Sequence, residues 1–76
     1  MKNLNRITAN HEIMLGKPVV RGTRLTVELL LRKMSEGATA VDLLDMYPQL
    51  EMDDIEAVLA YASALLANEE MIELAA

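Results

Sequence analysis

The chain contains no cysteine, no tryptophan and no phenylalanine, and only one histidine among its 76 residues. The lack of cysteine excludes disulfide bonds and thiolate metal sites. The single His11 cannot build a zinc site, because such a site needs several nitrogen or sulfur ligands. We therefore expect no metal and no other cofactor. Because small domains without such staples are marginally stable alone, we expect oligomerisation to supply further support.

Long hydrophobic runs are also missing, although 53% of the residues are apolar. No run approaches the roughly 18 apolar residues of a membrane helix. The N-terminus lacks the long apolar core of a signal peptide. The length fits a single domain over residues 1–76. We therefore expect one small cytoplasmic domain without a membrane partner.

Basic residues are absent from the second part of the chain. All seven Lys and Arg lie within residues 2–33, beside two acids, Glu12 and Glu28, so this part carries a net charge of +5. Residues 34–76 carry ten acids and no Lys or Arg, a net charge of −10, which makes −5 for the whole chain. Such a division suggests two faces with different partners. The alternative is that the two parts pack together and neutralise each other.

The stretch over residues 16–25, GKPVVRGTRL, holds two of the three glycines and three of the seven cations. Its two valines favour a β-strand, which the preceding proline keeps brief or at an edge. Gly22 permits a positive φ and turns the chain sharply between Arg21 and Arg24. The two guanidiniums then flank a tight turn. They can bind an outside anion, or carboxylates and helix ends of the same fold.

The short β-prone pair at residues 7–8 and the apolar runs at residues 13–15 and 19–20 predict a small ribbon of two or three strands. A lone ribbon is barely stable in water, so it must pack against helices or a second subunit. His11 lies in the predicted turn between the first two runs. No nucleophile or orienting acid is paired with it, so we expect a surface turn residue.

The first helix is expected to begin after Thr26, a good N-cap residue, and to end before Gly37. Arg32 and Lys33 lie in its last turns, where cations suit the negative end of the helix dipole. One apolar stripe at helical spacing is expected to face the core. Its members are Val27, Leu30, Leu31 and Met34.

A short second helix is expected between Thr39 and Tyr47. Thr39 and Asp42 form a capping box at its start, and the proline after Tyr47 ends it. Val41 and Leu44 are expected to face inward, and Leu43 is a further candidate.

The third helix is expected to open with residues 51–54, three of which are acidic, and to run to about Ala67. It carries the clearest apolar stripe of the sequence at helical spacing. The stripe consists of Ile55, Val58, Leu59, Ala62, Leu65 and Leu66. The apolar and acidic residues 68–76 are expected to form a short helical tail, which either caps the core or is covered by a partner.

Together these elements predict a mainly α fold: a β-ribbon over residues 1–25, a helix-turn-helix-like bundle of three helices over residues 26–67, and the tail. As a recognition helix, the third helix would present carboxylates to DNA, whose phosphates bind Lys and Arg. Any DNA contact is therefore predicted for the ribbon, the turn and the first helix. The candidates are Arg6, Lys17, Arg21, Thr23, Arg24 and Arg32.

The motif GKPVVRGTR at residues 16–24, followed by Tyr47-Pro48-Gln49-Leu50, Asp54-Ile55 and Ala60-Tyr61-Ala62, resembles the prokaryotic family called domain of unknown function 433. The resemblance extends over roughly residues 6–66. It implies a small helix-turn-helix-like fold that is often dimeric. It also implies an antitoxin of a type II toxin–antitoxin pair, commonly encoded beside a PIN-like ribonuclease.

By position, ten residues carry the family's motif: Gly16, Lys17, Pro18, Arg21, Gly22, Thr23, Arg24, Tyr47, Pro48 and Leu50. Two positions depart from the pattern. His11 stands where the family usually has proline, which loosens that turn. Glu51 stands where Ser or Thr would cap the third helix, and glutamate is a poorer cap whose charge still suits the helix dipole.

The expected function is therefore that of an antitoxin, with the ribonuclease toxin and double-stranded operator DNA as partners of a homodimer. The acidic tail is the expected toxin-binding segment, through Glu69, Glu70, Met71, Ile72, Glu73 and Leu74. The alternative is an adaptor module that binds only proteins. An enzyme is not expected, because no glycine-rich phosphate loop and no Cys-His or Ser-His-Asp set is present.

Overall fold

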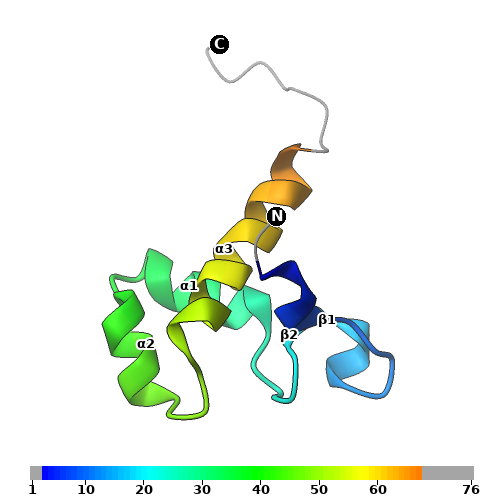
Figure 1. Cartoon of the computed structure of the whole chain (residues 1–76), viewed down its shortest axis with the longest axis horizontal. Helices are drawn as coiled ribbons and strands as arrows, with labels where there is room; N and C mark the ends of the chain where they lie inside the picture. Colours follow the sequence, from blue (N-terminus) through cyan, green and yellow to red (C-terminus); the bar gives the residue numbers. More distant parts are fainter. Residues whose placement is uncertain (1–2, 68–76) are drawn as a thin grey trace.

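The computed structural model describes residues 3–67, which form two short strands, three α-helices and two 3-10 turns (Figure 1). In chain order these are η1 Leu4–Arg6, β1 Ile7–Thr8, η2 Met14–Gly16, β2 Val19–Val20, α1 Val27–Ser35, α2 Ala40–Met46 and α3 Met52–Ala67. The prediction of a mainly α fold with an N-terminal ribbon is confirmed. The predicted tail, residues 68–76, lies outside the described residues.

The ribbon is an antiparallel pair of β1 and β2, with Ile7 opposite Val20. The other side of β2 is also occupied. Val19 forms a bridge with Thr26, and the Val20 N–H donates to the Leu25 carbonyl at 3.0 Å. These backbone contacts fix the ribbon to the start of α1, and both valines of β2 are buried.

The third predicted strand does not form, and the turn η2 stands in its place. Met14 and Leu15 have φ values of 49° and 57°, and Gly16 has 84°. Three consecutive residues in the left-handed region cannot continue an extended strand. The apolar run at residues 13–15 therefore contributes only one isolated bridge, between Asn10 and Ile13, to the ribbon.

The predicted helix ends are confirmed. The Thr26 hydroxyl accepts a hydrogen bond from the Leu29 N–H at 3.0 Å, and Gly37 follows α1 with φ 109°. At α2, the Thr39 N–H donates to the Asp42 carboxylate at 2.8 Å, and the Asp42 N–H donates to the Thr39 hydroxyl at 3.1 Å. This reciprocal pair is the capping box, so α2 begins where the sequence predicts.

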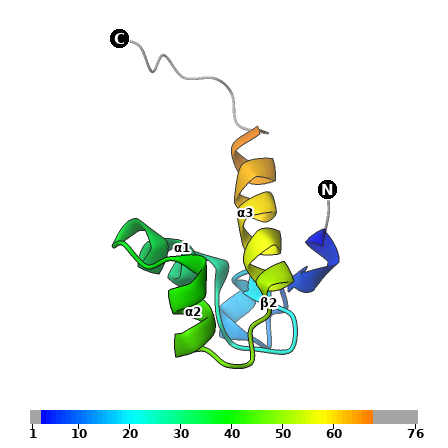
Figure 2. The ribbon, with the colours of Figure 1, turned by 60° about the vertical axis from the view of Figure 1, so that its left-hand side comes forward.

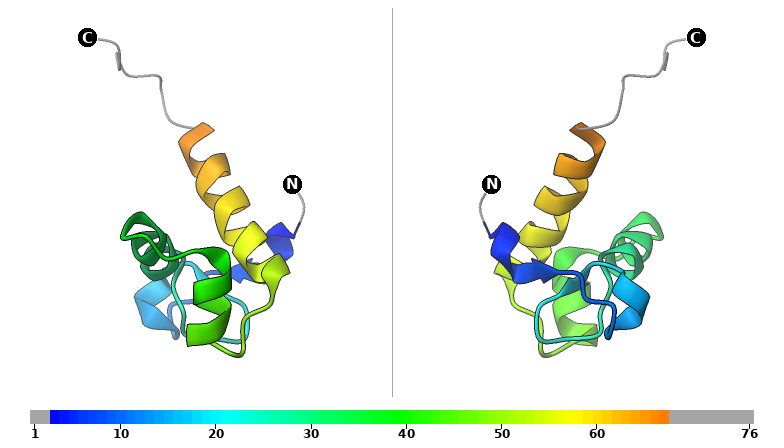
Figure 3. Two further views of the ribbon diagram at one scale, coloured as in Figure 1. Left: turned by 90° about the vertical axis from the view of Figure 1, so that its left-hand side faces the viewer. Right: turned by 90° about the vertical axis from the view of Figure 1, so that its right-hand side faces the viewer.

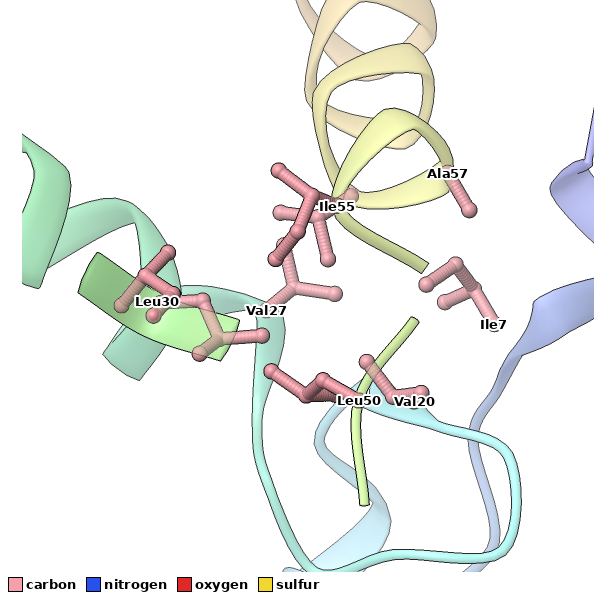
Figure 4. Close-up of a cluster of buried hydrophobic side chains, with 9 residues drawn as sticks. Ile7, Val20, Val27, Leu30, Leu50, Ile55 and Ala57 are labelled. Carbon is pink, nitrogen blue, oxygen red and sulfur yellow. The ribbon is translucent and has the colours of Figure 1, made fainter. Parts of the chain in front are cut away.

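The core lies where the ribbon, α1, α2 and the first turns of α3 meet. Figure 4 shows side chains of the ribbon, α1 and α3 converging there. Its members are Ile7, Val20, Val27, Leu30, Leu43, Leu50, Ile55, Ala57 and Val58. Leu31, Met34 and Leu44, which were predicted to face inward, are partly buried against this cluster.

The inward orientation predicted for Val41 is wrong, because its side chain is 61% exposed. Leu43 is fully buried instead. Residues two positions apart on a helix point in directions about 200° apart, so α2 cannot bury both Val41 and Leu43 in one narrow face. Leu43, which was only the further candidate, is thus the buried core residue of α2.

The predicted apolar stripe of α3 is present, but only part of it is buried in the core. Ile55 and Val58 are buried, but Leu59, Leu65 and Leu66 are 46%, 52% and 66% exposed. The stripe follows helical geometry as expected. However, the second half of α3 extends beyond the other elements, as the further views show (Figures 2 and 3).

Candidate nucleic-acid interface

The predicted turn after β2 is present and depends on Gly22. The Thr23 N–H donates to the Val20 carbonyl at 3.0 Å, which closes a β-turn. Gly22 has φ 82° at the third position of this turn, where a type II turn requires a positive φ. A Cβ at Gly22 would meet no atom within 4 Å, so backbone conformation and not space requires glycine here.

The hydroxyl of Thr23 forms its hydrogen bonds within the turn and the residues beside it. Its hydroxyl donates to the Val20 carbonyl at 2.8 Å and accepts from the Leu25 N–H at 3.0 Å. The only hydroxyl proton is therefore used inside the fold. Thr23 was predicted as a DNA contact, and the geometry gives this motif residue a structural task that its sequence position did not indicate.

Arg21 lies exposed at the second position of the turn, and Arg24 lies exposed directly after it. The Nε of Arg21 donates to the carbonyl of Asn5 at 2.8 Å, which fixes the base of the guanidinium against η1. Neither arginine forms an ion pair with another residue of the described range 3–67. These two predicted DNA contacts thus keep their charges available to an outside anion.

Arg6, also a predicted DNA contact, is bound by the acids at the start of α3. Its guanidinium lies 2.9 Å from the Glu51 carboxylate, 3.0 Å from Asp54 and 3.5 Å from Asp53. The hydrogen bond to Glu51 and then that to Asp54 raise the pKa of the Arg6 guanidinium above its ordinary value. Asp54 also accepts the Glu51 N–H at 2.8 Å. Arg6 therefore joins the N-terminal segment to α3.

This cluster lies at the end of α3 with which a helix-turn-helix recognition helix approaches the bases. α3 packs against η1 and β1 there. Sequence reasoning missed the ion pairs of Arg6, although one signal existed. No Lys or Arg follows Lys33, so the acids of α3 could find an intramolecular cation only in the first part of the chain.

Lys17 and Arg32 are brought together through Glu28 on the exposed side of α1. Lys17 Nζ donates to Glu28 at 3.1 Å, and Arg32 lies 3.6 Å from the other oxygen of this carboxylate. The hydrogen bond and charge of Lys17, followed by the charge of Arg32, lower the pKa of Glu28. Because exposed ion pairs are weak, both cations can exchange Glu28 for a phosphate.

The structure thus separates the six predicted DNA contacts into three groups. Arg21 and Arg24 lie in and directly after the turn, Lys17 and Arg32 share Glu28, and the side chains of Arg6 and Thr23 are bound to other groups of the fold. The predicted toxin-binding residues 69–74 lie outside the described residues. Within residues 3–67, no helix is long and apolar enough to cross a membrane. The same range holds no group of acidic or histidine side chains suited to a metal ion.

The architecture defines a small helical domain in which a helix-turn-helix order of elements is preceded by a β-ribbon. Residues 7–62 match the family described as protein of unknown function (DUF433). The match covers most of the 76 residues, and the chain belongs to this family. No curated protein and no solved structure matches the chain significantly.

Proposed function

We propose that this protein is the cytoplasmic antitoxin of a type II toxin–antitoxin pair. Its basic part binds operator DNA as a dimer, and its acidic C-terminal segment neutralises a PIN-like ribonuclease. The role that we expect from the resemblance of the sequence motifs supports this proposal. The observation that carries the proposal is the division of charge, with every Lys and Arg in residues 2–33 and ten acids after them.

The DNA-binding part of the proposal depends on cations that the fold leaves available. Arg21 and Arg24 have no carboxylate partner within residues 3–67, and Lys17 and Arg32 share a single exposed one. A two-fold axis doubles these four cations, which gives about eight phosphate contacts. This number is sufficient for salt-sensitive binding to a duplex.

The position of Arg6 supports a contact through the ribbon, the turn and α1 rather than through α3. Arg6 and η1 lie against the start of α3, where the carboxylates of Glu51 and Asp53 remain exposed. These charges repel phosphates. The turn at Arg21 and Arg24 carries no acid, so it is the better anion-binding surface.

The DNA-binding part is tested with fluorescence anisotropy on the DNA upstream of the protein's own reading frame. We expect Arg24→Gln to weaken binding about tenfold, because each chain of the dimer loses one phosphate contact. Gln49→Glu is the matched control, since it changes the net charge by the same amount at an exposed position after α2. Equal losses for both variants would contradict a role of the turn.

The toxin-binding part depends on the charge of residues 69–74. A ribonuclease site that binds RNA is electropositive, so an acidic segment can compete with RNA for it. We expect deletion of residues 69–76 to abolish inhibition of the neighbouring ribonuclease while DNA binding persists. Replacing only Glu69, Glu70 and Glu73 by Gln separates charge from apolar contact. Unchanged inhibition by the truncated chain would contradict this assignment.

An adaptor that binds only proteins is the second candidate. The net charge of −5 favours it, as do the exposed acids Asp42 and Asp45 on α2. The two functions differ in one measurable property. An adaptor shows no binding to upstream DNA even at low salt, whereas the proposed antitoxin binds and loses affinity as salt rises.

A further inference from the structure

The second half of α3 combines exposure with a complete lack of charge. Residues 57–67 contain no acidic or basic side chain, whereas the first turn of the same helix carries Asp53 and Asp54. A helix that is apolar on all sides is normally buried. In a single chain, however, the ribbon and the other helices cover only the first half of α3 (Figures 1 and 3).

The exposed surface continues the core. Ile55 and Val58 are buried, and the same helical face proceeds through four further residues at spacings of three and four. We call these the distal α3 face: Leu59, Ala62, Leu65 and Leu66. The three leucines are 46%, 52% and 66% exposed, so the apolar stripe leaves the body of the domain without being covered.

We propose that a second copy of this chain covers the distal α3 face, with the two α3 helices packed antiparallel around a two-fold axis at Ala62. In this register Leu59 of each copy lies opposite Leu65 of the other, three positions on either side of the axis. The surface is therefore self-complementary, as a two-fold contact requires. The small side chain of Ala62 permits close approach at the crossing point.

Charge favours a second copy in this antiparallel orientation. Each chain carries −5, so a contact through an uncharged surface keeps the like charges of two copies apart. Residues 57–67 supply such a surface. With a rise of about 1.5 Å per residue, antiparallel packing at Ala62 separates the two Asp53 residues by about 27 Å. That separation exceeds the Debye length of about 8 Å at physiological salt. Parallel helices would place these acids side by side.

The proposed function includes a dimer, and this inference rests on the proposed function because it specifies how that dimer forms. Its test needs neither DNA nor toxin. The mass of the full chain is measured by light scattering over a dilution series. We expect twice the 8.4 kDa of one chain. Leu66→Glu should weaken dimerisation about tenfold or more, because it buries an unpaired carboxylate. Val41→Glu, at an equally exposed apolar position on α2, should leave the dimer intact.

A second measurement uses the absence of cysteine from the sequence. Ala62→Cys places one thiol of each copy at the two-fold axis and should form a disulfide-linked dimer under mild oxidation. Ser63→Cys is the matched control, since its thiol lies about 100° further around the helix and should crosslink far more slowly. Circular dichroism on each variant verifies that the helices are intact.

A monomeric wild type would overturn the inference, as would a dimer that Leu66→Glu leaves unchanged or equal crosslinking at both cysteines. These failures differ from failure of the proposed function. A monomer that binds upstream DNA with steep salt dependence removes the interface and retains the DNA-binding part. A dimer through the distal α3 face that binds neither DNA nor ribonuclease retains the interface and removes the proposed function.

Discussion

Asp54 connects two distant parts of the chain through a single side chain that is 9% exposed. It accepts the Glu51 N–H at 2.8 Å and a guanidinium N–H of Arg6 at 3.0 Å. Asp54→Ala removes both hydrogen bonds and leaves the Glu51 N–H without its carboxylate acceptor. We expect the free energy of unfolding, measured in urea, to fall by about 1–3 kcal/mol.

Asp53→Ala is the control for this prediction, because it removes the same charge one position earlier. The Asp53 side chain is 51% exposed and lies 3.5 Å from Arg6. Exposed ion pairs contribute little, so we expect a change within about 0.5 kcal/mol. A loss equal to that of Asp54→Ala would mean that first-turn charge alone, and not the bridge to Arg6, stabilises α3.

Glu28 makes the stability depend on pH in a defined direction. Lys17 and Arg32 lower its pKa below the ordinary 4.5, so the unfolded chain binds a proton here more readily than the folded chain. The contribution is therefore complete above about pH 4.5 and disappears as the pH falls through the folded-state pKa. We expect the melting temperature of the wild type to exceed that of Glu28→Gln at pH 7, and the difference to shrink progressively as the pH falls below about 4.5.

Glu36→Gln is the control for the pH dependence. Glu36 is exposed at the C-terminal end of α1 and forms no ion pair within residues 3–67. The wild type should therefore show no advantage over this variant at pH 7. If Glu28→Gln and Glu36→Gln behave alike across this pH range, the trio of Lys17, Glu28 and Arg32 has no role in stability.

At the residue scale, local interactions could be predicted and distant ones could not. The caps at Thr26 and Thr39 depend on residues three positions away, so the sequence displays both partners. The bond from Arg6 to Asp54 spans 48 positions. Its existence depends on the tertiary approach of η1 to α3, which no local pattern of residues encodes.

At the element scale, α2 provides a matched pair of apolar residues in a helix of seven residues. Leu43 is fully buried, whereas Val41 is 61% exposed. We expect Leu43→Ala to lower the free energy of unfolding by about 2–5 kcal/mol, since it leaves a cavity in the core. Val41→Ala should change it by no more than about 0.5 kcal/mol. Comparable losses, measured in urea, would contradict the observed orientation of α2.

Helices α2 and α3 show what the spacing of apolar residues can and cannot predict. In α2, two turns contain too few apolar positions to distinguish an inward valine from an inward leucine. In α3, the spacing correctly predicts one continuous stripe. It does not predict how far the neighbouring elements reach along the helix, and that reach decides that Val58 is buried and Leu66 exposed.

At the scale of the whole molecule, the chain keeps some opposite charges together and others apart. Arg6 neutralises part of the acidic start of α3, as the alternative of internal pairing predicts. Arg21 and Arg24 remain outside such pairs within residues 3–67. The division of charge seen in the sequence is therefore preserved at the turn after β2, where the proposed DNA contact lies.

The salt dependence of binding to upstream DNA tests this division most directly. Affinity is measured by anisotropy from low to physiological salt for the wild type and Arg24→Gln. Lys17, Arg21, Arg24 and Arg32 of two chains give about eight phosphate contacts, so the logarithm of the association constant should fall against the logarithm of the salt concentration with a slope of about −7. Arg24→Gln should make the slope shallower by about 2. A flat response, or equal slopes for both proteins, would contradict the account.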